Sequence, residues 1–328
     1  MIFIFTSICD PHVDAVVKCL NLKNVNFIRI NSEDLFDSKV TFSYLITEST
    51  YCLNITSHGR QWNVEKINVV YYRRPEKLIL EKVDVERQIQ IDELWSSIHA
   101  ILFSFPDAIW LGHPLFDKVK SAKTLQHFIA RKLLTNKIKL PDSLVSNLAS
   151  VFEEFGNKYD DIILKPLNSR GVLTNSGWVP FFTERLNSSL LTKSCENQDC
   201  FNFQNAYFFQ NYIQKKVEWR ITVIGNSFFP CIIYSQENEF SANDWRKVDY
   251  TVVRHQSAEI SNELKEFCQK FMRDLGVIFG AFDFIENELG EFYFLECNVN
   301  GQWLWIEELT GMKISAEIAN FLIAQNEN

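Results

Sequence analysis

Three side chains near the end of the chain carry the oxygen atoms that a hard metal ion prefers: Asp283, Glu296 and Asn298. They lie in two aromatic-rich runs that we expect to form one hairpin, residues 279–298. Alternate side chains of a strand point to the same face, so Glu296 and Asn298 point the same way. A two- or four-residue turn places Asp283 on that face too, whereas a three-residue turn places it on the other. We expect the even-length turn.

Two carboxylates and one amide oxygen, without His or Cys, suit magnesium and not zinc. Magnesium with few protein ligands usually takes its remaining ligands from nucleotide phosphates. The alternative is that the three residues form the solvated face of a hairpin, but charges in such aromatic strands are costly without a partner. The sequence therefore predicts a site for Mg²⁺ and a nucleotide.

A nucleotide site also needs cations, and Lys165, Lys123 and Arg220 are candidates. Lys165 ends the apolar run 162–166, where an ammonium lacks a partner unless an anion binds. Lys123 lies on an expected helix, and a solvated helical lysine is an equally good interpretation of it. Arg220 lies two residues from Glu218 on the same strand face, so an internal Glu–Arg pair is the alternative there.

Other polar segments give weaker signals. Residues 244–246 (Asp-Trp-Arg) follow a long polar loop and fit ordinary surface equally well. Residues 72–75 (Tyr-Arg-Arg-Pro) end a strand, for which solvation is the common explanation. Residues 169–171 resemble a phosphate-binding loop only faintly, because glycine is scarce there. The six histidines show no metal-ligand spacing and no Gly-x-Ser-x-Gly element is present, so neither a zinc site nor a hydrolase triad has support.

The composition limits the class of protein. The 328 residues, 46% of them apolar, suffice for two or three domains with large cores. The net charge of -8 argues against a general nucleic-acid binder, because neutralising phosphates requires surplus Lys and Arg. No apolar run is long enough to span a membrane, and the eight cysteines include no Cys-x-x-Cys pair. We therefore expect reduced thiols, a cytoplasmic location, and neither nucleic acid nor membrane as a partner.

Apolar patterns divide the chain into three expected domains, residues 1–115, 116–205 and 206–328. The first is predicted to be a small α/β domain. The second is predicted to open with a helix over 116–135 and to contain a polar, flexible loop at 168–177. The third has two hairpins, a helix and terminal helices, which is typical of antiparallel α+β. The expected strands are 2–6, 25–30, 42–46, 51–56, 69–72, 108–111, 142–146, 161–166, 206–213, 218–224 and 227–234, with helices opening at Asp10-Pro11, over 81–105 and over 261–275.

The order of these motifs resembles that of the ATP-grasp family: Lys123, Leu-Lys165-Pro, Gln210-Asn-Tyr-Ile, Glu218-x-Arg220, Asp283 and Leu-Glu296-Cys-Asn298. Within it the chain resembles the microviridin-type peptide ligases, also called graspetide synthetases, which mature ribosomal peptides. The narrower resemblance rests on residues 72–75, 210–215, 218–225 and 244–246 and, most specifically, on Asn-Gly-Gln-Trp at 300–303. It covers nearly the whole chain and implies an ATP-grasp fold, mixed α/β and α+β, with an N-terminal pre-ATP-grasp domain at 1–115.

The resemblance also implies a role for each matching position. ATP phosphate and adenine would contact Lys123 and Lys165, and the adenine hinge would be lined by Gln210, Tyr212 and Ile213. Glu218 would hold the ribose hydroxyls. Magnesium would be bound by Asp283, Glu296 and Asn298. The catalytic group would be Arg220, Arg246 and Asp244, with both arginines facing the γ-phosphate and the acyl phosphate. Cys297 and Val299 depart from the family's usual Glu-Ile-Asn-Pro run, and both should face away from the metal.

The reaction that the resemblance implies is guided by a leader peptide. A ribosomal precursor peptide binds, an Asp or Glu of its core is phosphorylated, and a Ser or Thr hydroxyl or a Lys amine attacks to close a macrocyclic ester or amide. ATP and Mg²⁺ are the expected cofactors, and a homodimer is the expected assembly. Two alternatives stay open. One is an ATP-grasp ligase that adds amino acids to a small molecule or a protein tail, and the other is a non-catalytic peptide-binding module on the same fold.

Overall fold

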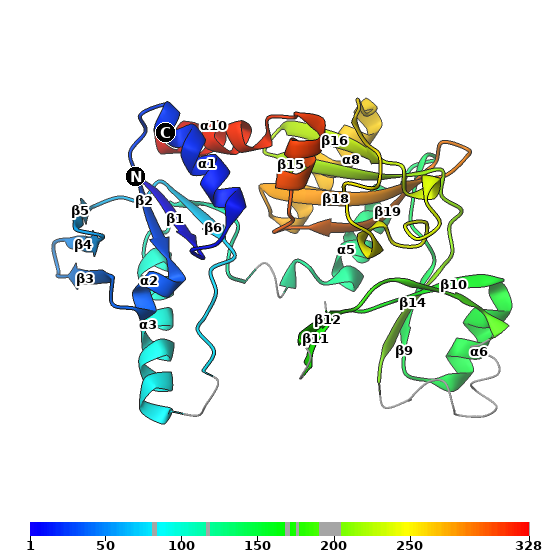
Figure 1. Cartoon of the computed structure of the whole chain (residues 1–328), viewed down its shortest axis with the longest axis horizontal. Helices are drawn as coiled ribbons and strands as arrows, with labels where there is room; N and C mark the ends of the chain where they lie inside the picture. The colour runs from blue at the N-terminus through cyan, green and yellow to red at the C-terminus, as the bar shows by residue number, and fades with distance from the viewer. Residues whose placement is uncertain (81–83, 116–118, 168–170, 175–176, 190–204, 328) are drawn as a thin grey trace.

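The computed structural model describes residues 1–327, with gaps at 81–83, 116–118, 168–170, 175–176 and 190–204. Three units follow one another along the chain, blue to cyan, green, and yellow to red in Figure 1, apart from β8 (Ile138–Lys139), which joins the sheet of the last unit. The faint phosphate-loop signal at 169–171 falls mostly outside the described residues. In the described part of the chain, no helix is both long and apolar enough to cross a membrane.

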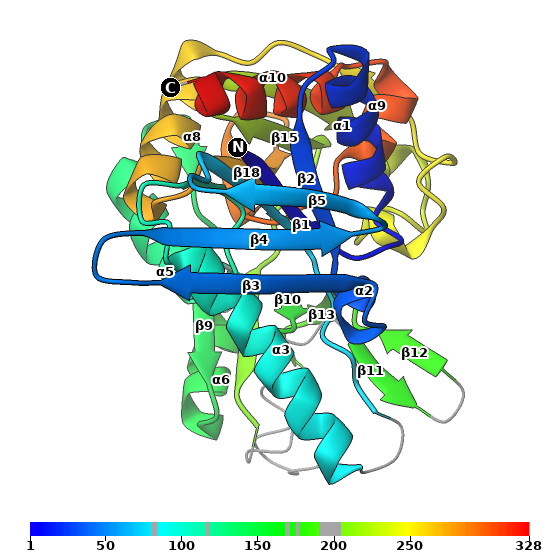
Figure 2. The same cartoon turned by 90° about the vertical axis from the view of Figure 1, so that its left-hand side faces the viewer.

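The first unit is built on a parallel sheet of order β2-β1-β6-β7. Because side chains alternate along a strand, Ile2 and Ile4 of β1 pack in the cluster that includes α1 and α10, while Phe3 and Phe5 pack on the other face near α3. Figure 2 shows a second, antiparallel layer, β3-β4-β5, in front of this sheet. The bounds are β1 Ile2–Thr6, α1 Pro11–Leu22, β2 Phe27–Asn31, α2 Ser32–Phe36, β3 Val40–Ile46, β4 Tyr51–Ser57, β5 Arg60–Val64, β6 Val69–Arg73, α3 Val85–Phe103 and β7 Ile109–Leu111.

The second unit is a small antiparallel sheet of order β13-β10-β14-β9 with a separate hairpin, β11-β12. Its core is a small aromatic cluster in which Phe152 of α6 packs against Ile162 and Phe209 of the sheet. The bounds are α5 Lys123–Ala130, η1 Arg131–Leu133, β9 Ser143–Ser146, α6 Ala149–Lys158, β10 Asp161–Lys165, β11 Gly171–Thr174, β12 Gly177–Pro180, β13 Glu184–Asn187 and β14 Tyr207–Asn211.

The third unit is a six-stranded sheet of order β17-β16-β15-β18-β19-β8, antiparallel except for the β19–β8 pair. Helix α8 packs against one face of this sheet, where the odd-numbered apolar residues of β15 point. On the opposite face, α9 and α10 pack over an apolar patch that includes Ile224, Phe279 and Ala281, and α10 also lies beside α1 (Figure 1). The bounds are β8 Ile138–Lys139, β15 Val217–Ile224, β16 Ser227–Ile233, η2 Ser235–Glu237, η3 Trp245–Lys247, β17 His255–Ser257, α8 Asn262–Leu275, β18 Phe279–Glu286, β19 Phe292–Asn298, α9 Leu304–Thr310 and α10 Ile314–Glu327.

Three expectations for the middle of the chain are corrected. The helix expected over 116–135 is interrupted, because Ala122 is extended and α5 runs only from Lys123 to Ala130. The segment expected as a polar loop at 168–177 contributes β11 and the start of β12, which pair with each other. The boundary drawn at residue 206 separates β14 from its sheet, since β14 bonds to β9 and β10.

Candidate active site

Asp283 and Glu296 face each other across β18 and β19, and a β-bulge brings them together. The strands pair Phe284 with Phe294 but Asp283 with Glu296, so Leu295 is an extra residue in β19. The loop between the strands has an odd number of residues, and without the bulge Asp283 would lie on the opposite face from Glu296. The expected even-length turn is therefore wrong, while the shared face that it was meant to explain is present.

Helix α5 holds the free edge of β19. Strand β8 pairs only with the start of β19. Further along, Gln126 donates to the carbonyl of Cys297 at 2.7 Å and accepts from its N–H at 2.8 Å. The Nε2 atom of His127 lies 3.0 Å from the carbonyl oxygen of the bulge residue Leu295. These side chains replace the hydrogen bonds of a missing neighbouring strand, so the bulge is fixed from outside the sheet.

Two ion pairs lie at this end of the sheet. Arg220 Nη1 is 2.8 Å from both carboxylate oxygens of Asp283, and Lys123 Nζ is 3.3 Å from Glu296 Oε2. Burial raises the pKa of Asp283, although the positive charge of Arg220 acts to lower it. Burial also disfavours the Glu296 carboxylate, but the surrounding cations, Lys123 foremost, outweigh it and lower the pKa of that group. Both carboxylates therefore lie in a strongly cationic setting.

The internal Glu218–Arg220 pair that the sequence left open is not formed. Glu218 accepts from Lys215 Nζ at 2.9 Å and from Ser235 Oγ at 2.7 Å, whereas Arg220 pairs with Asp283. The two side chains share a face of β15 but have separate partners.

A cavity of about 950 Å³ lies between the central sheet and the polar end of the C-terminal sheet. Its lining includes every site residue singled out from the sequence: Lys123, Lys165, Gln210, Tyr212, Ile213, Glu218, Arg220, Asp244, Arg246, Asp283, Glu296 and Asn298. The structure thus brings all of them together, and their individual roles stay predictions.

The central sheet supplies the wall opposite the ion pairs. Lys165 ends β10, and burial lowers the pKa of its ammonium to about 8, although the Glu296 charge acts in the other direction. Gln210 donates to Ser143 Oγ at 3.0 Å, which fixes its amide. The guanidinium carbon of Arg185 lies 3.8 Å from the centre of the Tyr212 ring, in a cation–π contact. A half-buried lysine and a hydrogen-bonded amide suit the phosphate and base of a nucleotide.

The donor set of Asp283, Glu296 and Asn298 fits magnesium when other ligands complete the shell. Among the described residues no group of three or more His, Cys, Asp or Glu lies close enough to hold a metal alone. Asn298 accepts a hydrogen bond from the N–H of Asn300 at 3.1 Å, which orients its amide oxygen. Magnesium characteristically combines one or two carboxylates with phosphate oxygens and water.

Two families match consecutive parts of the chain. Residues 1–117 match the MvdD pre-ATP grasp domain, and residues 131–299, more than half of the chain, match the ATP-grasp domain of prokaryotic glutathione synthetase. The chain belongs to the ATP-grasp family. The predicted fold and the predicted class of enzyme, an ATP-dependent carboxylate ligase, are confirmed.

Solved structures show the same fold at low sequence identity. A RiPP-associated ATP-grasp ligase of Chryseobacterium gregarium, in complex with ADP and a leader and core peptide, has a TM-score of 0.86 at 24% identity and covers 99% of this chain and 96% of that one. The macrocyclase MdnC of Microcystis aeruginosa, bound with precursor peptide MdnA, has a TM-score of 0.79 at 21% identity, covering 99% and 100%. The ligase PsnB, complexed with minimal precursor, Mg and ADP, has a TM-score of 0.73 at 19% identity, covering 99% and 96%. No curated protein matches the sequence.

The pre-ATP-grasp domain reaches the ATP-grasp site through two arginines whose partners the sequence reasoning missed. Arg73 is 2% exposed and Nη1 donates to the carbonyl and amide oxygens of Asn300 and to the carbonyl of Gly301. Arg74 binds the same Asn300 carbonyl through Nε and Nη2. The solvated strand end expected at 72–75 is therefore wrong. The signal was two adjacent cations after a buried strand, but their partner lies 227 residues away in the sequence.

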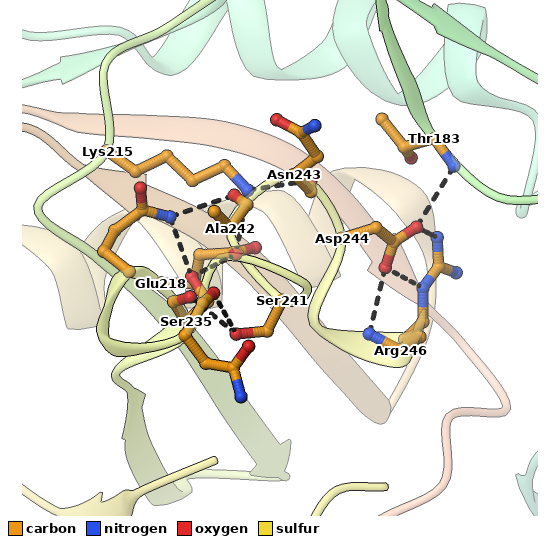
Figure 3. Close-up of polar contacts among 11 residues, drawn as sticks. Thr183, Lys215, Glu218, Ser235, Ser241, Ala242, Asn243, Asp244 and Arg246 are labelled. Atoms are coloured by element: carbon orange, nitrogen blue, oxygen red, sulfur yellow. Dashed lines mark hydrogen bonds and ion pairs between the residues drawn. The ribbon is translucent and has the colours of Figure 1, made fainter. Parts of the chain in front are cut away.

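Another arginine in the lining of the ATP-grasp cavity, Arg246, also joins two units. Its guanidinium donates to the carboxylate of Asp244 through Nε at 2.8 Å and Nη2 at 2.6 Å (Figure 3). Asp244 also accepts from the N–H of Thr183, which lies between β12 and β13 of the central unit, at 3.1 Å. Burial disfavours this carboxylate, but Arg246 more than compensates, so the pKa of Asp244 is lowered. The Asp-Trp-Arg turn therefore bridges two units instead of lying on ordinary surface.

Proposed function

We propose that this ATP-grasp chain closes rings in a ribosomally made precursor peptide by activating its Asp or Glu side chains. The observation that carries the proposal is one cavity lined by Lys123 and Lys165, by the acidic hairpin of Asp283 and Glu296, and by two arginines, in a chain whose first 117 residues match the MvdD pre-ATP grasp domain. The likeness to ligases solved with leader and core peptides runs along 99% of the chain and supports the same reading.

Each site residue is assigned the role that suits the chemistry of its side chain. Lys123 and Lys165 bind phosphate and the neighbouring part of the nucleotide, with the edge of β14 and the residues after it (Gln210, Tyr212, Ile213) against the adenine and Glu218 on the ribose. Asp283, Glu296 and Asn298 would hold Mg²⁺ together with the phosphates. The metal neutralises charge on the transferring phosphoryl group.

The two-step chemistry explains why ATP is needed. A peptide carboxylate oxygen bonds to the γ-phosphorus as the bond to ADP breaks, giving an acyl phosphate. A Ser or Thr hydroxyl or a Lys amine then bonds to the acyl carbon, phosphate leaves with the electron pair, and the proton passes to phosphate or solvent. We assign to Arg220 and Arg246, both of which line the cavity, the stabilisation of the transferring phosphate and the leaving phosphate, and to Asp244 the orientation of Arg246.

The two alternatives make different use of the same cavity. A ligase for small molecules or protein tails would also need the nucleotide and metal residues, but the Asn-Gly-Gln-Trp loop at 300–303, held by Arg73 and Arg74, favours the peptide cyclase. A non-catalytic binding module would have no need for both carboxylates, which are costly to bury. We propose that the enzyme acts in the cytoplasm as a homodimer, without nucleic acid or membrane as a partner.

The test is direct. The purified protein is incubated with ATP, Mg²⁺ and the precursor peptide encoded beside its gene, and the peptide is followed by mass spectrometry. Each ring should appear as the loss of one water, with one ADP formed per ring. A peptide that keeps its mass while an amino acid is added to another acceptor would favour the first alternative. Peptide binding without any ADP formation would favour the binding module.

A further inference from the structure

Lys215 lies between two parts of the site that the proposed reaction must use together. It lies two residues before β15 and is 7% exposed, and although it ends the motif at 210–215, the sequence assigned it no role. Its ammonium donates to Glu218 Oε1 at 2.9 Å and to the carbonyl oxygen of Asn243 at 3.0 Å. A lysine is seldom buried this far unless partners fix it, so both contacts matter to the local structure.

On one side, Lys215 fixes the carboxylate proposed to hold the ribose. Glu218 Oε1 accepts from Lys215 and also from Ser235 Oγ at 2.7 Å. Because both donors bind the same oxygen, the second carboxylate oxygen is left for a hydroxyl donor. The ammonium also offsets the charge of Glu218 inside the protein.

On the other side, Lys215 holds the residue that precedes the Asp244 turn. The segment from Ser235 to Asn243 is folded on itself, since Ser241 Oγ donates to the Ser235 carbonyl at 2.7 Å and Gln236 donates to the Ala242 carbonyl at 2.9 Å. Asn243, whose carbonyl Lys215 binds, leads directly into η3. Figure 3 shows this path from Lys215 to the Asp244–Arg246 pair.

We infer that Lys215 is a positioning residue that couples the ribose site at Glu218 to the turn that aims Arg246. The inference rests on the proposed function, because it takes Glu218 as the ribose ligand and Arg246 as a group acting on the phosphates. A nucleotide that orders Glu218 orders Lys215, and Lys215 in turn holds the Asn243 carbonyl. Such coupling is reciprocal, so loosening the turn weakens nucleotide binding by the same factor.

The first arm of the test reads the structure and needs no peptide. Lys215→Met keeps the apolar stem and removes both hydrogen bonds. Lys216→Met is the matched control, because the Lys216 side chain is exposed and its ammonium comes no closer than 3.8 Å to the carboxylate of Glu286. Hydrogen exchange of the backbone amides of 244–247 should slow when ATP binds the wild type and Lys216→Met. In Lys215→Met exchange should be several-fold faster and lose most of its response to ATP. Unchanged exchange would overturn the inference and leave the proposed function standing.

The second arm separates the two contacts by kinetics. Ser235→Ala removes a contact to Glu218 but none to Asn243, so it should raise the KM for ATP and retain most of kcat. Lys215→Met should raise that KM and also lower kcat at saturating ATP by about tenfold or more, the size expected when one charge-assisted contact is lost. Equal kcat in Ser235→Ala and Lys215→Met would overturn the coupling.

The coupling can be tested even if Lys215→Met does not fold. If Lys215→Met fails to fold because Glu218 is left buried and unpaired, Lys215→Met/Glu218→Gln removes both charges and is compared with Glu218→Gln alone. A further kcat loss in the double variant supports the anchoring of Asn243, and the absence of one contradicts it. If no variant or wild type closes rings, the proposed function fails, while the hydrogen-exchange arm still decides the coupling.

Discussion

Arg220 Nη1 lies 2.8 Å from both carboxylate oxygens of Asp283, and Nη2 of the same guanidinium donates to the carbonyl of Gln302 at 3.2 Å. One side chain thus ties the strand of Asp283 to the loop after Asn298. The approach is close enough to require glycine at 301, because a Cβ there would lie 3.0 Å from Arg220 Nη2 and 2.6 Å from the Ala281 side chain. The glycine of the Asn-Gly-Gln-Trp motif is therefore explained by packing against the active site.

Removing either carboxylate of the hairpin should abolish turnover. Asp283→Ala and Glu296→Ala each lose a proposed metal ligand, so the rate of ring formation should fall by at least about 100-fold to 1000-fold, as expected for the loss of several kcal/mol of charge stabilisation. Mass spectrometry of the peptide across a magnesium titration measures this.

The matched control is Glu288→Ala, an exposed acid in the loop of the same hairpin. Circular dichroism should show that the variants are folded, although Asp283→Ala also leaves Arg220 unpaired and should lower the free energy of unfolding by about 3–5 kcal/mol. Wild-type turnover of either variant at saturating magnesium would remove these residues from the metal site.

The two lysines should contribute to ATP affinity independently of catalysis. Lys123→Ala and Lys165→Ala each remove a charge-assisted contact of about 1.5–3 kcal/mol, so affinity measured by calorimetry should fall about tenfold or more. Lys137→Ala, an exposed lysine outside the cavity lining, should bind ATP as the wild type does. If both cavity variants kept wild-type affinity, the solvated-lysine interpretation would be restored.

ATP binding should depend on pH through Lys165. Burial holds its pKa at about 8 in the nucleotide-free protein, below the usual value for lysine. A bound phosphate favours the charged form and raises this pKa, so above about pH 8 binding must take up a proton, and affinity should fall by up to about tenfold per pH unit. Calorimetry in two buffers of different ionisation heat measures the uptake. Lys165→Met should lose it, and an uptake that survives in this variant would assign the proton to another group.

Arg246→Lys should separate binding from chemistry. Lysine keeps the charge but not the planar fork that matches a carboxylate or an acyl phosphate, so the variant should bind ATP and leader peptide almost normally yet form no rings. Calorimetry and mass spectrometry of one preparation give both readouts. Full-speed ring formation would refute the role at the chemical step, and loss of leader binding would move Arg246 to substrate docking.

The sequence predicted the strands and the gathering of site residues better than it predicted the contacts between them. The apolar runs of β1, β15 and β18 are long enough for period-two reasoning to find them, and that reasoning placed Glu296 beside Asn298. It could not foresee the bulge, because the hydrogen bonds that satisfy Leu295 and Cys297 come from α5, far away in the sequence.

The same limit applies to the arginines and to Lys215. Arg73 reads as a solvated strand end until Asn300 is seen beside it, and Lys215 reads as one of two ordinary adjacent lysines until Asn243 is seen. Each contact joins segments that meet only in the tertiary structure, so a local sequence pattern cannot predict it.

The bulge in β19 makes the hydrogen bonds that hold it, and not only the acidic residues, a condition for function. Straightening the bulge without losing a residue would pair Asp283 with Leu295 and send Glu296 to the face covered by α8. Deleting Leu295 itself would instead leave Asp283 opposite Glu296 in a regular ladder. When distant relatives are aligned, the two acidic residues should therefore lie one residue closer in the sequence where the bulge is absent and the loop has the same length.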